Sequence, residues 1–406
     1  MTTLDWHYKG LPLDLGEIEL ADIGKQGWNV LRGDLPTPVM VLLRDPLADN
    51  IAAMAVWCAE RDLLLAPHGK STMAPHIFER QLAAGAWALT CATPWHMRVY
   101  REVGVSRIIY ANELVEPAAL RYVAAELSRD PAFELYCLAD SVAGVEIMQR
   151  ELAAAGAPRP VGVFVEVGHE GGRCGCRTVE EAVAVADAVT AAPLLSLRGV
   201  EAFEGLRSAT DLAAAQAGVD AFMAKLLEVF DRVGHLLPEN PILTAGGSAF
   251  FDRVALAFEG RPVTKVIRSG CYVTQDGGHY DRVSPLGSVR GGPLRNAMEV
   301  WGVVLSRPEP GLALTSFGRR DVPYDLGLPA PVWLARDGER RPLVGAETIG
   351  LSDQHGHVRV TPETDIRPGD LLGATISHPC GAFDRWRLLP VVDDAYDVVD
   401  AVTTVF

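Results

Sequence analysis

A lysine follows the first of a series of predicted β-strands, in the segment Ala66-Pro67-His68-Gly69-Lys70-Ser71-Thr72. If these strands form a barrel, Lys70 lies at the C-terminal mouth, where partial burial favours the neutral amine that forms Schiff bases. The alternative is a lysine in a solvated loop, because most lysines are surface groups. His68 lies two positions earlier, at the same strand end, where it is placed to support a cofactor.

Glycine and serine residues follow the seventh and eighth predicted strands. The segments are Thr244-Ala245-Gly246-Gly247-Ser248 and Arg268-Ser269-Gly270-Cys271-Tyr272. Such loops expose backbone N–H groups near a helix start, and they are the usual phosphate position in an eight-stranded α/β barrel. Glycines also close ordinary βα turns. A Schiff-base lysine opposite a phosphate site is the arrangement that pyridoxal phosphate needs.

The elements that must position these residues alternate along the chain. Short apolar runs rich in β-formers are separated by Ala-rich helical segments, which is typical of βα units around a parallel sheet. The eight strand segments are 63–67, 86–91, 107–111, 133–138, 161–167, 197–203, 241–245 and 263–267. The helical segments between and after them are 73–84, 95–103, 117–128, 141–155, 178–191, 209–234 and 248–259. We therefore predict an α/β fold built on a TIM-type (β/α)8 barrel.

The length of 406 residues exceeds what one core usually holds, so we expect two domains. After about residue 280, short apolar runs are separated by Pro/Gly turns, which predicts a mostly β domain. The expected organisation is an N-terminal segment (1–35) that packs with the β domain, a barrel (36–280) that binds the cofactor, and a β domain (281–406) that carries a metal site. Within 36–280, the segment 37–43 is expected to precede the barrel without joining its wall.

Composition excludes several classes of protein. The chain is 49% hydrophobic and 22% charged, which is ordinary for a globular protein, and its net charge is −15 without any basic run. We expect no binding to nucleic acid or membranes. The N-terminal sequence has no signal-peptide pattern and no stretch approaches 18 apolar residues, so we expect a cytoplasmic protein. The seven cysteines are odd in number and scattered, as expected of reduced thiols.

A second site is predicted at His378-Pro379-Cys380. On an extended segment, residues i and i+2 point to the same face, so the imidazole and the thiolate could share one ion. This pair of ligands favours zinc over magnesium or calcium, and it leaves coordination positions open for water or substrate. The alternative is a buried cysteine beside an unrelated histidine.

These segments together resemble a known family. Pro67-His68-Gly69-Lys70-Ser71, Glu166-Val167-Gly168 with Arg173 and Gly175, Gly246-Gly247-Ser248 and Ser377-His378-Pro379-Cys380 occur in the order found in D-serine dehydratases and D-threonine aldolases. These are fold-type III, alanine racemase-like pyridoxal phosphate enzymes. The resemblance runs from about Pro36 to the C-terminus. It implies a barrel with a β domain, usually a homodimer, in which Lys70 carries the cofactor.

The resemblance also suggests roles near the barrel mouth. It places Arg173 against the cofactor's phenolic oxygen, the alternative being a surface arginine that pairs with Glu170 or Glu180. Many relatives have Tyr where this chain has Phe203, so we assign Phe203 no polar role. Glu204 either orients a neighbouring group or is a solvated carboxylate at the rim.

A histidine in the β region is a further candidate for catalysis. The family often has a His-Gly pair where this chain has His355-Gly356, so His355 lies either near the active site or in an ordinary turn. The predicted catalytic residues are Lys70 and His355, and the predicted metal ligands are His378 and Cys380. The predicted cofactor-binding residues are Lys70, His68, Arg173, Gly246, Gly247, Ser248, Ser269, Gly270 and Tyr272.

Cys380 distinguishes the reactions known in the family. Dehydratases of the group have His-x-Cys and aldolases have His-x-Asp, so this chain is expected to eliminate water from a β-hydroxy D-amino acid such as D-serine, with pyridoxal phosphate and Zn²⁺. The products would be a 2-oxo acid and ammonia. The alternatives are a D-threonine-type aldolase that releases glycine and an aldehyde, a pyridoxal phosphate carrier without turnover, and a racemase. The sequence does not choose between D-serine, D-threonine and D-3-hydroxyaspartate.

Overall fold

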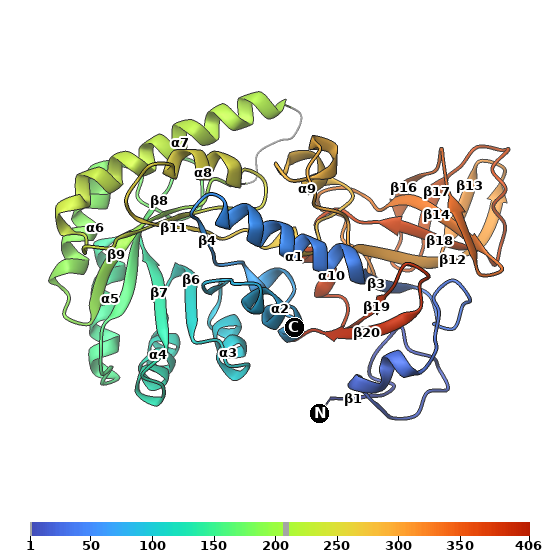
Figure 1. Ribbon diagram of the computed structural model, residues 1–406, viewed down its shortest axis with the longest axis horizontal. Helices are drawn as coiled ribbons and strands as arrows, with labels where there is room; N and C mark the ends of the chain where they lie inside the picture. The colour runs from blue at the N-terminus through green and yellow to red at the C-terminus, as the bar shows by residue number, and fades with distance from the viewer. Residues whose placement is uncertain (1, 206–210) are drawn as a thin grey trace. The chain divides into compact units, whose positions relative to one another are not determined.

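A computed structural model describes residues 2–205 and 211–406 (Figure 1). Contacts divide the chain into two compact units. The first, here called the barrel unit, comprises Ala55–Lys70 and Gln81–Gly270. The second, here called the β unit, comprises Met1–Met54, Ser71–Arg80 and Cys271–Phe406. Each unit is thus assembled from segments that are separated in the sequence.

The barrel unit contains eight parallel strands in the order β4-β11-β10-β9-β8-β7-β6-β5. They are β4 (Leu64–Leu65), β5 (Leu89–Cys91), β6 (Arg107–Glu113), β7 (Glu134–Ala139), β8 (Val161–Val167), β9 (Leu195–Ala202), β10 (Ile242–Ala245) and β11 (Thr264–Ile267). The two outer strands of this order meet, because the Trp87 N–H donates to the Leu65 carbonyl at 2.8 Å and the Thr90 N–H donates to the Pro67 carbonyl at 2.9 Å. The predicted eight-stranded α/β fold is confirmed.

Helices follow the strands close to the predicted positions. They are α3 (Pro94–Glu102), α4 (Pro117–Arg129), α5 (Val142–Ala154), α6 (Val179–Ala191), α7 (Leu212–Val233) and α8 (Phe251–Phe258), while α1 (Arg44–Ala59) and α2 (Pro75–Ala83) contain residues of both units. Thr178 caps α6 in a reciprocal box with Glu181, which satisfies N–H groups that have no partner inside the helix. In the described ranges, each helix is too short or too polar to cross a lipid bilayer.

The β unit is dominated by a mixed sheet in the order β15-β14-β18-β12-β13-β17-β16, and β3, β19 and β20 extend it beside β12. The strands are β3 (Val39–Leu43), β12 (Met298–Glu309), β13 (Leu312–Thr315), β14 (Ala330–Arg336), β15 (Glu339–Pro342), β16 (Glu347–Leu351), β17 (Gly356–Arg359), β18 (Leu371–Thr375), β19 (Leu388–Val392) and β20 (Val398–Thr403). This agrees with the mostly β character predicted for the C-terminal region.

Strand β3 differs from the division expected at residue 36. It pairs antiparallel with β12 and parallel with β19, so the segment assigned to the barrel domain contributes to the sheet of the β unit. The physical reason is that Val39, Met40, Val41 and Leu42 are all completely buried, and a strand covered on both faces needs hydrogen-bonded neighbours on its two edges.

The N-terminal segment forms the two-stranded pair β1 (Thr3–Leu4) and β2 (Ile18–Glu19), followed by the 3₁₀ helix η1 (Leu20–Lys25). Its buried apolar side chains share one core with residues of the mixed sheet. Those from the segment are Leu4, Leu11, Leu20, Ile23, Val30, Leu31 and Leu35, and they pack with a group that includes Trp301, Leu388, Tyr396 and Val398.

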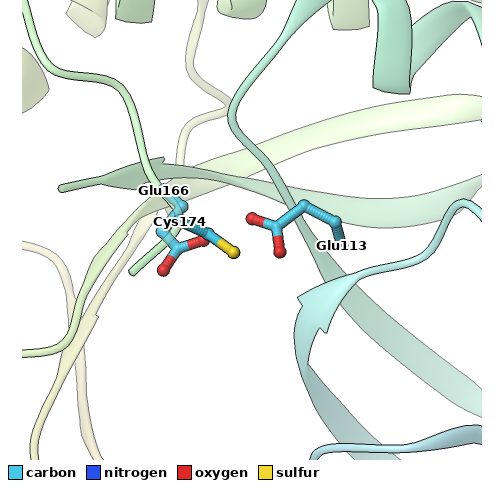
Figure 2. A group of neighbouring side chains, drawn as sticks. All are labelled: Glu113, Glu166 and Cys174. Atoms are coloured by element: carbon cyan, nitrogen blue, oxygen red, sulfur yellow. The ribbon is translucent and has the colours of Figure 1, made fainter. Parts of the chain in front are cut away.

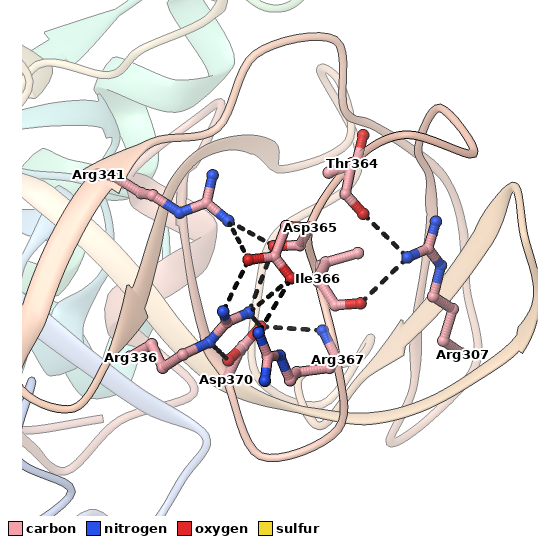
Figure 3. A network of polar contacts seen from close by, with 8 residues as sticks. All are labelled: Arg307, Arg336, Arg341, Thr364, Asp365, Ile366, Arg367 and Asp370. Atoms are coloured by element: carbon pink, nitrogen blue, oxygen red, sulfur yellow. Dashed lines mark hydrogen bonds and ion pairs between the residues drawn. The ribbon is translucent and has the colours of Figure 1, made fainter.

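A network of charged residues fixes the start of β18, the strand that leads to His378 (Figure 3). The Arg336 guanidinium donates to both Asp370 oxygens, at 2.7 and 2.8 Å, and the Arg367 N–H donates to Asp370 at 2.9 Å. Arg336 also pairs with Asp365 at 2.7 Å. The two acidic side chains differ in exposure, because Asp370 is 2% and Asp365 59% exposed. Of the two ion pairs of Arg336, only the one with Asp370 has a carboxylate that is shielded from water.

We predict that Asp370→Asn lowers the melting temperature by roughly 5 °C or more, because the amide removes a buried charged acceptor and cannot accept both guanidinium bonds. Asp365→Asn is the matched control, since it removes an exposed partner of the same arginine and should change the melting temperature by less than about 2 °C. Calorimetry of both variants measures the difference. Equal melting temperatures would contradict the role of burial in this network.

Candidate functional site

Lys70 lies in the single turn η2 (Gly69–Ser71), directly after β4. His68 precedes it, and its N–H donates to the Arg268 carbonyl at 3.3 Å. The Nδ1 atom of His68 is buried and has no hydrogen-bond partner. Burial lowers the pKa of His68 well below its ordinary value, and the nearby cations Lys70, Arg268 and Arg173 lower it further. The imidazole is therefore neutral, and one ring nitrogen faces no protein partner.

The two predicted phosphate loops lie side by side, because β10 and β11 pair in parallel up to Ala245 and Ile267. The Gly270 N–H donates to Ser248 Oγ at 3.2 Å, and Ser269 Oγ donates to the Gly247 carbonyl at 2.7 Å. Ser248 and Ser269 are both buried. The hydroxyls and backbone amides of both segments are thus gathered at the C-terminal ends of adjacent strands, the position from which barrels bind phosphate.

The loop after β10 requires glycine at positions 246 and 247, one for its backbone conformation and the other for lack of space. Gly246 has a φ of +124°, which side chains of L-residues rarely adopt. A Cβ atom on Gly247 would lie 3.1 Å from the Phe203 ring and 3.2 Å from Glu204 Oε1. The Gly247 N–H donates to Glu204 Oε1 at 2.6 Å. Glu204 is completely buried, so its interpretation as a solvated rim carboxylate is wrong, and it orients the Gly247 backbone.

Arg173 and Arg268 bring positive charge to the same unit. The guanidinium of Arg173 lies 4.3 Å from the centre of the Phe203 ring, a cation–π contact that uses the ring face and needs no hydroxyl. Among the described residues, Arg173 forms no ion pair with Glu170 or Glu180. Arg268 is buried, pairs with Glu201 and donates to Thr244 Oγ1 at 2.6 Å.

An acidic group at the strand ends was not predicted from the sequence (Figure 2). Glu113 ends β6, Glu166 lies near the end of β8 and Cys174 lies in the following loop, and one ligand atom of each lies within 4.8 Å of the others. Burial raises the pKa of Glu166 to about 11, and the neighbouring carboxylates of Glu201 and Glu113 contribute. The raised pKa favours the neutral form of Glu166. The available signal was weak: each carboxylate closes a barrel strand, where functional side chains concentrate.

A small cavity adjoins this group. Its volume is about 190 Å³, and its lining includes Glu166, Arg173, Cys174 and Phe203. The barrel unit thus offers a lysine amine, a buried unpartnered imidazole nitrogen, two arginines and glycine-rich loops with buried hydroxyls. These residues fit pyridoxal phosphate, whose aldehyde needs an amine and whose phosphate needs N–H, O–H and cationic partners. The Gly247 N–H, the Gly270 N–H and Ser269 Oγ already donate within the protein, to Glu204 Oε1, Ser248 Oγ and the Gly247 carbonyl, so a phosphate group has to replace these acceptors.

The predicted metal ligands belong to the β unit, and their local backbone is not extended. His378 has a φ of +65°, and Pro379 is the N-cap of the short helix α10 (Cys380–Phe383). The expectation that positions i and i+2 share a strand face is therefore wrong. The reason is that the ring of Pro379 fixes φ at a value suited to the start of a helix.

His378 is held by two carboxylates. Its N–H donates to Asp276 Oδ2 at 2.9 Å, and its Nδ1 lies 2.5 Å from Asp325 Oδ2. A carboxylate on one ring nitrogen is the usual partner of a metal-binding histidine, whose other nitrogen then coordinates the ion. Cys380 Sγ lies 3.2 Å from Cys271 Sγ and 3.2 Å from Ser71 Oγ.

An imidazole with a carboxylate partner and an adjacent thiol fits zinc by donor chemistry. In the described residues, three ligand atoms lie within 4.8 Å of one another at Glu113, Glu166 and Cys174. Among the residues that the structure describes, His378 and Cys380 do not form such a group with a third ligand. His378 is oriented toward Asp325 in this structure.

Two further predicted residues also lie in the β unit. Tyr272 is buried in η5 (Cys271–Val273). His355 is exposed in the turn between β16 and β17, where its carbonyl accepts the Ser352 N–H at 2.8 Å. The cofactor contact of Tyr272 and the catalytic role of His355 stay predictions.

Comparisons with known proteins match both parts of the chain. The family described as "Alanine racemase, N-terminal domain" matches residues 44–274, and "Putative serine dehydratase domain" matches residues 297–392. A D-threonine aldolase from Arthrobacter sp. is 28% identical over 367 residues, which cover 88% of this chain and 89% of that protein.

Solved structures with a similar fold come from the same group of enzymes. The crystal structure of a D-threonine aldolase from Filomicrobium marinum superposes with a TM-score of 0.77 and 25% identity, covering 93% of this chain and 96% of the other. The D-threo-3-hydroxyaspartate dehydratase from Delftia sp. HT23 has the same fold, with a TM-score of 0.72 and 21% identity over 93% and 99% of the two chains. The protein therefore belongs to the alanine racemase-like family of fold-type III pyridoxal phosphate enzymes, whose serine dehydratase domain its C-terminal part matches.

Proposed function

We propose that this protein is a pyridoxal phosphate- and zinc-dependent dehydratase that eliminates water from a β-hydroxy D-amino acid, giving a 2-oxo acid and ammonia. The observation that carries the proposal is the position of Lys70 at the C-terminal end of β4, in the same unit as the serine- and glycine-containing loops after β10 and β11. The named relatives are lyases of D-amino acids with a β-hydroxyl group, which supports the substrate class. We expect a homodimer, as the family resemblance implies.

Pyridoxal phosphate, when bound, supplies a conjugated ring that takes up the electron pair released at the substrate Cα. Lys70 would hold the cofactor through its amine, and the same amine, once free, would remove the α-proton. His68 is neutral, so its unpartnered Nδ1 binds the cofactor without adding charge. Ser248, Ser269 and Gly270 would hold the phosphate end, and the Arg173 guanidinium, which packs against the Phe203 ring, would face the cofactor.

Zinc, when held by His378 and Cys380, supplies a Lewis acid that makes the β-hydroxyl a better leaving group. Asp325 occupies Nδ1 of His378, so Nε2 is the nitrogen left to bind the metal. The dehydrated product leaves the enzyme as an enamine and hydrolyses to the 2-oxo acid and ammonia. D-Serine would give pyruvate.

A D-threonine-type aldolase is the second candidate function. The 28% identity to a D-threonine aldolase over 88% of this chain favours it. In that reaction the β-hydroxyl is deprotonated and the Cα–Cβ bond breaks. Cys380 favours the dehydratase, because dehydratases of the group have His-x-Cys where aldolases have His-x-Asp.

We predict that Lys70→Ala abolishes the visible absorbance of lysine-bound pyridoxal phosphate and lowers turnover by at least about a thousand-fold, because both the covalent attachment and the base are lost. Lys25→Ala is the control, since Lys25 is 76% exposed and pairs only locally with Asp22. Spectra of both purified variants after addition of the cofactor test this. An unchanged spectrum for Lys70→Ala would overturn the assignment.

We predict that the purified protein releases a 2-oxo acid and ammonia from at least one β-hydroxy D-amino acid, that a chelator abolishes this activity and that zinc restores it. The measurement is product analysis with D-serine, D-threonine and D-3-hydroxyaspartate, with the L-enantiomers as controls. Glycine and an aldehyde would establish the aldolase instead. Bound cofactor without turnover would favour a carrier.

A further inference from the structure

We propose that Cys271 is a second thiolate ligand of the metal ion held by His378 and Cys380, so that this protein has a Cys₂His zinc site. The inference rests on the metal site of the proposed function and adds a ligand outside its His-x-Cys motif. Cys271 and Cys380 are 109 residues apart in the sequence, and both belong to the β unit.

The two sulfur atoms are 3.2 Å apart. Two thiolates on one tetrahedral zinc lie about 2.3 Å from the metal, and the tetrahedral angle then separates them by roughly 3.8 Å. A disulfide requires a separation of about 2.05 Å. The observed distance therefore needs a smaller change to admit zinc between the sulfurs than to form a bond between them.

The backbone around both cysteines is anchored, so their proximity does not depend on the two side chains alone. The buried carboxylate of Asp276 accepts N–H bonds from Gly278 and Tyr280, both at 2.9 Å, and from His378 at 2.9 Å. This fixes the segment after Cys271 against the segment before Cys380. The Gly277 N–H donates to the Ile376 carbonyl at 3.2 Å, so the two segments are in direct backbone contact. A Cβ atom on Gly277 would meet the Thr375 side chain, and one on Gly278 would meet the Ser377 side chain.

The surroundings of the sulfurs suit a ligand set with one open position. Cys271 is 5% exposed, whereas Cys380 is more accessible. The His378 imidazole has to turn toward the sulfurs, and the Asp325 side chain, which now lies on its Nδ1, is 55% exposed and therefore has room to move with the ring. Three protein ligands leave the fourth position of a zinc ion for water or substrate. Two thiolates also cancel the charge of Zn²⁺, which favours tight binding.

The test is a count of sulfur ligands by zinc K-edge X-ray absorption on the full-length protein loaded with one equivalent of zinc under reducing conditions. We expect two sulfurs at about 2.3 Å in the wild type and one in Cys271→Ser. Cys380→Ser provides an independent measurement, because it should retain one sulfur ligand, contributed by Cys271. Circular dichroism spectra show whether each variant is folded.

Cys174→Ser is the matched control, because Cys174 belongs to the acidic group of the barrel unit. Its sulfur count should equal that of the wild type. An equal count in wild type and Cys271→Ser, or no sulfur ligand in Cys380→Ser, would overturn the assignment of Cys271 while leaving the His378 and Cys380 site intact. Loss of sulfur in Cys174→Ser would place the metal in the acidic group and overturn both. A wild type that binds no zinc would also overturn both.

Discussion

The buried carboxylate of Asp276 is the interaction on which the geometry of the β unit near His378 depends. It is completely buried and has four backbone N–H donors, from Gly278, Tyr280, Asp281 and His378. Taking a carboxylate out of water is costly unless such donors replace the water. The same group of bonds starts the helix α9 (His279–Val283) and fixes the backbone of His378. One acidic side chain thus joins the segment after β11 to the segment after β18.

In the barrel unit, the main electrostatic feature is a group of neighbouring carboxylates. Three carboxylates, those of Glu113, Glu166 and Glu201, gather where an anionic cofactor is expected. Burial raises the pKa of Glu166, which favours its neutral form, and Arg268 pairs with Glu201, so the local negative charge is smaller than the count of acidic residues suggests. Lys70, Arg173 and Arg268 are the nearby cations around His68. This balance lowers the net negative charge at the strand ends of the barrel unit.

The fold could be predicted from the sequence because hydrophobic runs and helix-forming segments are local signals, and all eight barrel strands appear at their expected places. Pairing partners are not local. The apolar run Val39–Leu43 predicts a strand but does not identify β12 and β19 as its partners. Its place in the β unit was therefore missed. The residues of the predicted site were found through motifs, whereas the contact between Cys271 and Cys380 and the group of Glu113, Glu166 and Cys174 depend on the folding of distant segments.

The discontinuous composition of the β unit constrains its biosynthesis. Strand β3 emerges early during translation, but its partner β12 begins at Met298 and β19 begins at Leu388. The completely apolar strand Val39–Leu43 must therefore remain unpaired while the ribosome makes the entire barrel sequence. An unpaired apolar strand is prone to aggregate. Long-range pairing of this kind also slows folding. Nascent chains that end within the barrel sequence therefore carry this apolar strand without its native partners.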